Sequence, residues 1–359
     1  MRTEIGSEFW TGCTPLDGQG ITDILPQGFE SRMTLCGRTA LELILRDLMA
    51  ERQVRKAYLP SYCCHTMIEP FLTKGIEVEF YDVYFAENGI ALDFHAENDC
   101  DVVFLMDYFG FLDPQTERLA REQRQRNKIV LYDATHALFA HTRDYSPYHY
   151  VFASFRKWFG VNGGFCAKAE TWTCAFPHLE NSSYSELRSR CFHLKASYMA
   201  HDNDDKAVFL EGFSRAEDQL ETDYLGYSPD SESVEVLQQI NPEGIRIKRR
   251  ANAQHVIAQI NSWQDQRVFS PYRGMTPQEC PLFVPLYVDP ALRADLRTWL
   301  IQNEIYLPVH WPVSGVHCLH ARTRRIYDSE LSFVCDQRYG ADHMNRAVSA
   351  IKVFLETGR

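Results

Sequence analysis

The chain has 359 residues, of which 45% are hydrophobic and 24% charged, and its formal net charge is −11. This length favours a large domain plus a smaller one, and the acidic balance argues against nucleic acid or an anionic membrane as a partner. No apolar run reaches membrane-spanning length, and no secretory signal follows the charged start Met1–Ile5. Eleven cysteines without paired metal-ligand spacing indicate reduced thiols, a cytoplasmic protein and no metal site.

From residue 38 to about residue 170 the sequence alternates between helical and strand periods. The first helix is indicated by apolar residues at a 3.6-residue period, at Ala40, Leu41, Ile44, Leu45 and Leu48. The elements expected after it are a strand at 57–59, a helix at 67–72, strands at 78–81 and 102–106, a helix at 114–126, and strands at 129–132, 150–153 and 164–167. Because strands alternate with helices, the pattern predicts an α/β fold with a mostly parallel central sheet and helices on both faces.

The pattern changes after residue 180. Helical periods dominate 182–220 and 234–263, and a strand at 282–288, a helix at 291–302, a strand at 331–334 and a helix at 343–355 complete the chain. This tail predicts a smaller C-terminal α+β domain at 246–359, preceded by a large domain with an N-terminal arm at 1–245.

Two polar residues follow the strand at 129–132. Asp133 comes directly after it and His136 three residues later. Ligands of such sheets bind outside the carboxyl ends of the strands, and a buried aspartate there needs a cation or hydrogen-bond donors. Alone, Asp133 also fits a helix cap or a turn, and His136 also fits an ordinary satisfied polar residue.

A lysine follows the next strand. Lys157 lies three residues after Ser154, among aromatic residues and just before Asn162-Gly163-Gly164. An apolar setting disfavours the ammonium form and makes the amine a better nucleophile, although an isolated loop lysine would carry no meaning. An amine beside a ring-binding carboxylate is what a pyridoxal phosphate (PLP) enzyme needs: the lysine forms a Schiff base and the acid pairs with the pyridine nitrogen.

The first long helix supplies a candidate anion site. Gly37-Arg38-Thr39-Ala40 begins this helix, where backbone N–H groups and the helix dipole attract negative charge. Ordinary capping explains a glycine–threonine helix start equally well, so the signal depends on Asp133 and Lys157.

The order of these motifs resembles the DegT/DnrJ/EryC1/StrS family of aminotransferases. These are fold-type I PLP enzymes, and many of them act on keto sugars linked to nucleotides. The resemblance covers roughly residues 30 to 355 and is carried by Gly37–Leu41, Leu59–Tyr62, Asp107–Gly110, Asp133–Ala137, Ser154 to Lys157 with Gly163-Gly164, and Asp336–Tyr339.

The resemblance implies a role for each of these residues. Lys157 would carry the cofactor, Asp133 would pair with the pyridine nitrogen, and His136 would approach the ring hydroxyl. Gly37, Arg38, Thr39 and Ser154 would hold the phosphate. The family is dimeric with shared active sites, which implies a homodimer in which part of 162–164 or 224–228 lies near the neighbour's cofactor.

Three features depart from the family pattern. The step from Ser154 to Lys157 is shorter than the family's spacing. Cys63-Cys64-His65 stands where an aromatic residue commonly stacks on the ring, so Tyr62 or His65 takes that role, with His65 slightly favoured. Asn162-Gly163-Gly164 replaces a more usual Gly-Glu-Gly-Gly.

The leading hypothesis is therefore a PLP-dependent aminotransferase that moves an amino group from an amino acid, expected to be glutamate, to a keto acceptor such as a keto sugar. Arg156 and Arg338, with Arg249 and Arg250, are candidates for holding a carboxylate or phosphate, although each also fits an ordinary ion pair. Trp311, beside His310, suggests a compact substrate site near the small domain. The alternatives are a PLP-dependent lyase, decarboxylase or racemase on the same scaffold, and a PLP-binding protein without catalysis.

Overall fold

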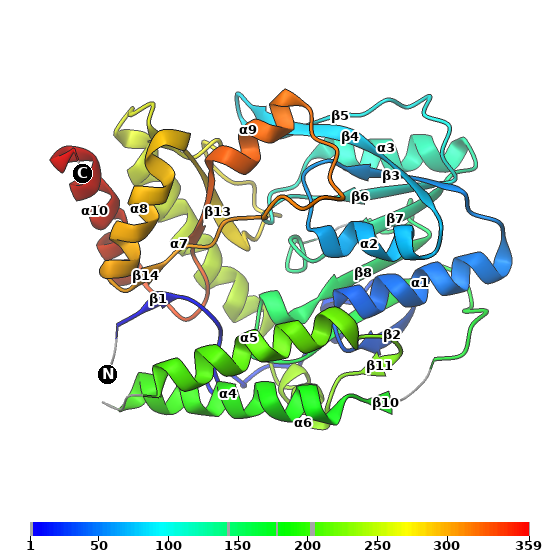
Figure 1. The fold of residues 1–359 in the computed structure, drawn as a ribbon, viewed down its shortest axis with the longest axis horizontal. Helices are drawn as coiled ribbons and strands as arrows, with labels where there is room; N and C mark the ends of the chain where they lie inside the picture. Colours follow the sequence, from blue (N-terminus) through cyan, green and yellow to red (C-terminus); the bar gives the residue numbers. More distant parts are fainter. Residues whose placement is uncertain (1–2, 142–143, 177–178, 202–204, 359) are drawn as a thin grey trace.

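The computed structural model describes residues 3–141, 144–176, 179–201 and 205–358. A sheet of eight strands forms the centre of the larger part (Figure 1), in the order β2-β9-β8-β7-β6-β3-β4-β5. The strands are β2 (Glu30–Thr34), β3 (Lys56–Pro60), β4 (Glu77–Ala86), β5 (Gly89–Asp93), β6 (Val102–Met106), β7 (Ile129–Asp133), β8 (Tyr150–Ser154) and β9 (Gly164–Lys168). The five central strands, β8 to β4 in this order, are parallel, and β2, β9 and β5 run antiparallel to their neighbours.

Both faces of this sheet are buried, because alternate residues of the same strand enter two different cores. In β6, Val102 and Phe104 join the core under α1 (Gly37–Glu51) and α2 (His65–Thr73), whereas Val103 and Leu105 join the core on the other face. Side chains alternate between faces along a strand, and a strand that is apolar throughout therefore needs cover on both sides. The predicted mostly parallel α/β sheet is confirmed.

The C-terminal part contains an antiparallel sheet, β12-β13-β15, surrounded by helices. Its elements are α7 (Pro242–Ser262), β12 (Val268–Phe269), β13 (Phe283–Val288), α8 (Pro290–Gln302), β14 (Ile305–Tyr306), α9 (Ala321–Ser329), β15 (Glu330–Val334) and α10 (Ala341–Thr357). Because α7 runs through residue 245, the chain passes into this part along one continuous helix. The domain division at residue 245 stays a prediction.

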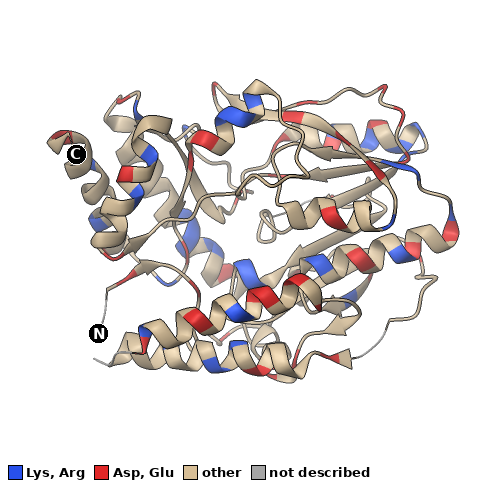
Figure 2. Ribbon diagram, in the orientation of Figure 1, with Lys and Arg blue, Asp and Glu red and all other residues tan. Residues whose placement is uncertain are grey.

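Two features outside the central sheet shape the site. A pair of long helices, α4 (Ser182–Ala200) and α5 (Lys206–Thr222), lies beside the large sheet near the N-terminal segment (Figure 1). That segment contains β1 (Ile5–Gly6), which pairs with β14 of the C-terminal part. Figure 2 shows acidic and basic residues interspersed along α4 and α5. The remaining short elements are the 3-10 turns η1 (Thr22–Ile24) and η2 (Phe155–Lys157), α3 (Pro114–Gln125), α6 (Ser231–Leu237), β10 (Leu179–Glu180) and β11 (Tyr227–Ser228).

In the part of the chain that the structure describes, no helix is both long and apolar enough to span a membrane. All eleven cysteines are free thiols.

Candidate functional site

The site lies where β7 and β8 end side by side. Asp133 is the last residue of β7 and pairs in register with Phe152 of β8. After Ser154, the last residue of β8, one 3-10 turn leads to Lys157. Because neighbouring parallel strands end at the same edge of a sheet, this turn carries the lysine past the strand end that also holds the aspartate.

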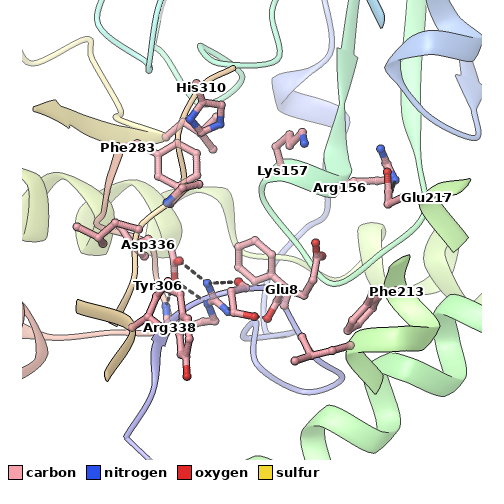
Figure 3. Close-up of a pocket in the computed structure, with 18 of the residues that line it drawn as sticks. Glu8, Arg156, Lys157, Phe213, Glu217, Phe283, Tyr306, His310, Asp336 and Arg338 are labelled. Carbon is pink, nitrogen blue, oxygen red and sulfur yellow. Dashed lines mark hydrogen bonds and ion pairs between the residues drawn. The ribbon is translucent and has the colours of Figure 1, made fainter. Parts of the chain in front are cut away.

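The Lys157 side chain is exposed to a cavity. Within the described residues, its amine has no hydrogen-bond or ion-pair partner. Burial lowers the pKa of both His136 and His310, and the charge of Lys157 adds to this effect. In Figure 3, Lys157 and His310 lie at the upper end of the cavity, and Asp336, Arg338 and Glu8 lie at the lower end. The amine therefore faces open space and is near enough to both buried imidazoles for its charge to act on them.

Asp133 is a buried carboxylate that has no cationic partner among the residues described. It is 1% exposed, and Oδ1 accepts a hydrogen bond of 2.8 Å from the Thr135 N–H. Burial raises its pKa to about 6. A carboxylate in such a position favours the arrival of a ligand cation, because the cation would offset the cost of burying the charge.

His136 is a neutral hydrogen-bond donor. Its Nδ1 accepts a hydrogen bond of 3.1 Å from the Phe109 N–H, which leaves the proton on Nε2. Burial, followed by the charge of Lys157, lowers its pKa to about 3. Trp311 stacks on the imidazole with ring centroids 5.4 Å apart, and Tyr62 packs against Trp311.

The N-terminus of α1 meets the end of β8. A Cβ added at Gly37 would lie 3.3 Å from the Ser154 Cβ, so the glycine permits this close approach. The Ser154 hydroxyl oxygen is buried and has no hydrogen-bond partner in the structure, and the N-cap residue Cys36 makes no side-chain cap. Unpaired N–H groups at a helix start, next to an unpartnered hydroxyl, form an arrangement that suits an anion.

The side chains of Arg38 and Thr39 are engaged nearby. Arg38 forms an ion pair of 2.9 Å with Glu221 at the end of α5 and lies over the Tyr224 ring. The Thr39 hydroxyl donates a hydrogen bond of 2.7 Å to the Tyr224 carbonyl oxygen. Arg38 thus ties α1 to α5 and Thr39 ties it to the segment after α5, and the backbone of α1 remains the part open to an anion.

His65 lies at the start of α2, on the same side as Arg38. Its Nε2 is 3.8 Å from the Glu221 carboxylate, and its Nδ1 is 3.8 Å from the Cys64 thiol. His65, Glu69 and Glu221 bring possible metal-ligand atoms within 4.8 Å of one another. Tyr62 packs against Trp311, which stacks on His136, whereas His65 lies near Glu221. The contact between His65 and the cofactor ring stays a prediction.

Arg156 and Arg338 are both held in the cavity wall by carboxylates. Arg156 is 2.7 Å from Glu217 and 2.9 Å from the Tyr184 hydroxyl, and although burial opposes it, Arg156 and Arg188 hold the pKa of Glu217 at about 2. Arg338 binds both oxygens of the Asp336 carboxylate and donates a hydrogen bond of 3.0 Å to the Glu8 carbonyl oxygen.

The cavity around Lys157, called the Lys157 cavity below, has a volume of about 580 Å³. Much of its wall is apolar, from α5, β13 and the segment after β14. Its charged lining comprises Arg156, Lys157, Arg188, Arg249, Arg297 and Arg338 against Glu8, Glu217 and Asp336. In a chain with a net charge of −11, this excess of cations favours an anionic ligand.

Several lining residues were not found from sequence. Arg188 is on α4, Glu217 is on α5, and Glu8 is on the N-terminal segment. Each lies in an ordinary helical or irregular pattern, and no local signal marks it. By contrast, Asp133, His136 and Ser154 are buried and do not belong to the lining of the Lys157 cavity.

No protein-family profile and no curated protein matches the sequence. Solved structures do match the fold. PseC of Helicobacter pylori, an aminotransferase involved in the biosynthesis of pseudoaminic acid, gives a TM-score of 0.68 at 11% identity, over 98% of this chain and 94% of that one. The aminotransferase TlmJ of Streptoalloteichus hindustanus gives 0.63 at 13% identity, over 91% and 86% of the two chains. A putative sugar aminotransferase of Streptococcus pneumoniae in its PLP form gives 0.62 at 13% identity, over 98% and 93%. The chain therefore has the fold of PLP-dependent transferases of fold type I.

Proposed function

We propose that the chain is a PLP-dependent aminotransferase that belongs with the DegT/DnrJ/EryC1/StrS enzymes. The observation that carries the proposal is the amine of Lys157, one turn past the end of β8 and unpartnered within the described residues, together with the buried Asp133 at the end of the neighbouring strand β7 and the neutral His136. The fold is shared with several proteins described as aminotransferases, two of them as sugar aminotransferases, which supports the same reaction class for this chain.

The residues present fit the cofactor. The Ser154 hydroxyl is buried without a partner beside the uncapped start of α1, as expected of a phosphate site that is filled by a ligand. Asp133 would hold the protonated ring nitrogen, and Nε2 of His136 would donate to the ring oxygen. Pyridoxal phosphate, when bound, supplies an aldehyde that condenses with amines and a ring that withdraws electrons.

The remaining chemistry belongs to side chains of this protein. Lys157 Nζ would hold the cofactor in the resting state and, once displaced by the incoming amine, would move a proton between carbon atoms as a base. The Lys157 cavity would bind the substrates, and its cationic lining favours a donor and an acceptor that carry carboxylate or phosphate groups. Glutamate as donor and a keto sugar as acceptor are the proposed pair.

The proposal includes a homodimer and a cytoplasmic location. The dimer is supported by the family resemblance, and the location by the eleven free thiols, which suit a reducing compartment.

Reconstitution with PLP is the experiment that tests the reaction class. We expect the full chain to take up the cofactor with an absorbance band near the visible region, and glutamate to shift the spectrum to that of pyridoxamine phosphate. A protein that stays colourless with PLP would contradict the proposal. A coloured protein whose spectrum no amino donor shifts would instead favour the lyase, decarboxylase or racemase class.

Replacing Ser154 with alanine should separate cofactor binding from stability. The dissociation constant for PLP should rise about tenfold or more, because a hydrogen bond to a charged group contributes about 1.5 to 3 kcal/mol. The free energy of unfolding of the cofactor-free protein should stay within about 1 kcal/mol of the parent, since the hydroxyl has no partner to lose.

Ser185→Ala is the matched control, because the Ser185 hydroxyl on α4 is also buried without a partner. It should leave PLP binding unchanged. Equal PLP affinity of S154A and the parent, measured by titrating absorbance, would remove Ser154 from the phosphate site.

A further inference from the structure

Three buried residues form a hydrogen-bonded chain that ends at the Lys157 cavity. His310 Nδ1 is 2.7 Å from the Ser332 hydroxyl, and the Ser332 hydroxyl contacts the Glu330 carboxylate. Glu330 and Ser332 stand two residues apart on β15, so their side chains share one face of that strand. Both are fully buried, and only His310 reaches the cavity.

Further contacts hold the three hydrogen-bonded side chains in a fixed geometry. The His310 N–H donates a hydrogen bond of 2.7 Å to the other Glu330 carboxylate oxygen, and the Ser332 N–H donates one of 2.9 Å to the Pro308 carbonyl oxygen. Phe283 also packs against the imidazole, with ring centroids 4.9 Å apart. This leaves Nε2 as the His310 atom that can meet a ligand.

A carboxyl group in the core is costly to bury, so packing alone does not explain the presence of Glu330 beside Ser332 and His310. Glu330 carries its carboxyl group into the core, and burial raises its pKa to about 8. The charges that face the carboxyl group are Arg293 and Arg297 of α8, and Arg293 donates to the Glu330 backbone oxygen. His310 is faced by His136 and Lys157, and burial, reinforced by these two groups, lowers its pKa well below the ordinary value.

A buried histidine of this kind is a poor base alone, because an imidazolium ion would be stranded without solvent. The hydrogen-bonded chain removes that obstacle. When Nε2 accepts a proton, the Nδ1 proton can pass to Ser332 while the Ser332 proton passes to the Glu330 carboxylate. The imidazole ends neutral, with its proton on Nε2, and one proton has moved from the ligand to Glu330.

We propose that His310 is a second proton-transfer residue of the Lys157 cavity, and that Ser332 and Glu330 relay its proton. This inference rests on the proposed aminotransferase function for its substrate, an amine that condenses with a carbonyl compound. In that condensation a C–N bond forms and a C–O bond breaks. The nitrogen gives up two protons and the oxygen leaves with two as water, so a group that takes a proton from nitrogen and returns it to oxygen balances the step.

The relay can be tested without any cofactor, by nuclear magnetic resonance of the full chain labelled with ¹⁵N-histidine. The His310 signals are assigned by their absence in His310→Asn. We expect His310 to stay neutral from pH 6 to 9.5 and to change tautomer near pH 8, from Nε2–H below to Nδ1–H above, as Glu330 ionises. In Glu330→Gln the amide donates to Ser332 at every pH, so His310 should keep Nε2–H throughout.

Two results would overturn the relay. One is a His310 ring that becomes an imidazolium near pH 6.5, as an ordinary histidine does. The other is a tautomer that stays the same from pH 6 to 9.5 in the parent protein. Neither depends on PLP binding, so the relay and the proposed function can fail separately.

Transfer kinetics test the role of His310 in the reaction. His310→Asn and Ser332→Ala should take up PLP with an unchanged spectrum, while the rate of the glutamate-induced shift falls by about 10² to 10⁴-fold. Glu330→Gln should lose the parent's pH dependence near pH 8. Added imidazole should restore part of the rate in His310→Ala, because it can occupy the vacated space, whereas a purely structural loss would not be restored.

His193→Asn is the matched control, since His193 is an exposed histidine on α4, and its rate should equal that of the parent. A parent-like rate in both His310→Asn and Ser332→Ala would exclude His310 from proton transfer. If His310→Asn does not fold, Ser332→Ala and Glu330→Gln carry the same comparison.

Discussion

Lys157→Ala is expected to abolish the absorbance band that the parent protein gives with PLP and to lower the transfer rate by about 10⁴-fold. The amine is the atom that would bind the cofactor aldehyde and move the proton, and in the described part of the chain no other lysine lines the Lys157 cavity. The fold should be unaffected, because within the described residues the amine makes no hydrogen bond or ion pair whose loss would cost stability. Absorbance after PLP addition and stopped-flow mixing with glutamate measure the two effects.

Lys248→Ala is the control for this variant, as Lys248 is an exposed lysine of α7. It should keep both the band and the rate. A Lys157→Ala protein that binds PLP with the parent's spectrum would show that another amine carries the cofactor.

The largest expected loss of stability comes from a different lysine, Lys168 on β9. Its ammonium lies 2.8 Å from Asp47 of α1, a carboxylate with no exposed surface, and it also contacts Glu51. Lys168→Met should lower the free energy of unfolding by about 3 to 5 kcal/mol, because the substitution leaves a buried carboxylate without its cation. Urea denaturation followed by circular dichroism measures the change.

The size of this loss should depend on pH. Burial opposes ionisation of Asp47, but the hydrogen bond from Lys168 and those from Cys174, Tyr150 and Thr173 hold its pKa below the ordinary value. A carboxyl group whose pKa is lowered by folding stabilises the protein above its unfolded pKa and loses that effect as the pH falls through the folded pKa. The deficit of K168M should therefore be full at pH 7 and shrink below about pH 4.

Lys352→Met controls for the removal of a charge. Lys352 is 57% exposed on α10 and lies 4.0 Å from Glu356, so its removal should change the free energy of unfolding by less than about 1 kcal/mol. A similarly small effect of K168M would show that the ion pairs of Lys168 with Asp47 and Glu51 add little to stability.

The central sheet could be predicted because its signals are local. The strand at 102–106 has the bounds given by its apolar run, and the strands at 129–132 and 150–153 each gain one residue, Asp133 and Ser154. The edge strand β2 was missed because its residues are half-buried and largely polar. The helix α9, with the sequence ARTRRIYDS, was missed because it has few apolar residues to mark a period.

The sequence predicts the positions of site residues only where the order and direction of the strands determine them. Neighbouring parallel strands must bring Asp133 and Lys157 to one edge, whatever the loops do. The partners of Arg38 could not be predicted, because Glu221 is 183 residues away and belongs to a helix whose packing no local pattern determines. The same holds for Arg188 and Glu217, which reach the cavity only because α4 and α5 lie beside it.

The two ends of the chain meet in the wall of the Lys157 cavity. Arg338 donates to the carbonyl oxygen of Glu8, 330 residues earlier, and Tyr339 accepts the N–H of Gly6. During synthesis, the large sheet can form while the C-terminal sheet is still being made, and the first residues gain their partners in steps. Glu8 can meet Arg188 of α4 early, β1 must wait for β14, and Gly6 must wait for Tyr339. The wall of the cavity is therefore completed only once Arg338 has been added, long after the strand that leads to Lys157.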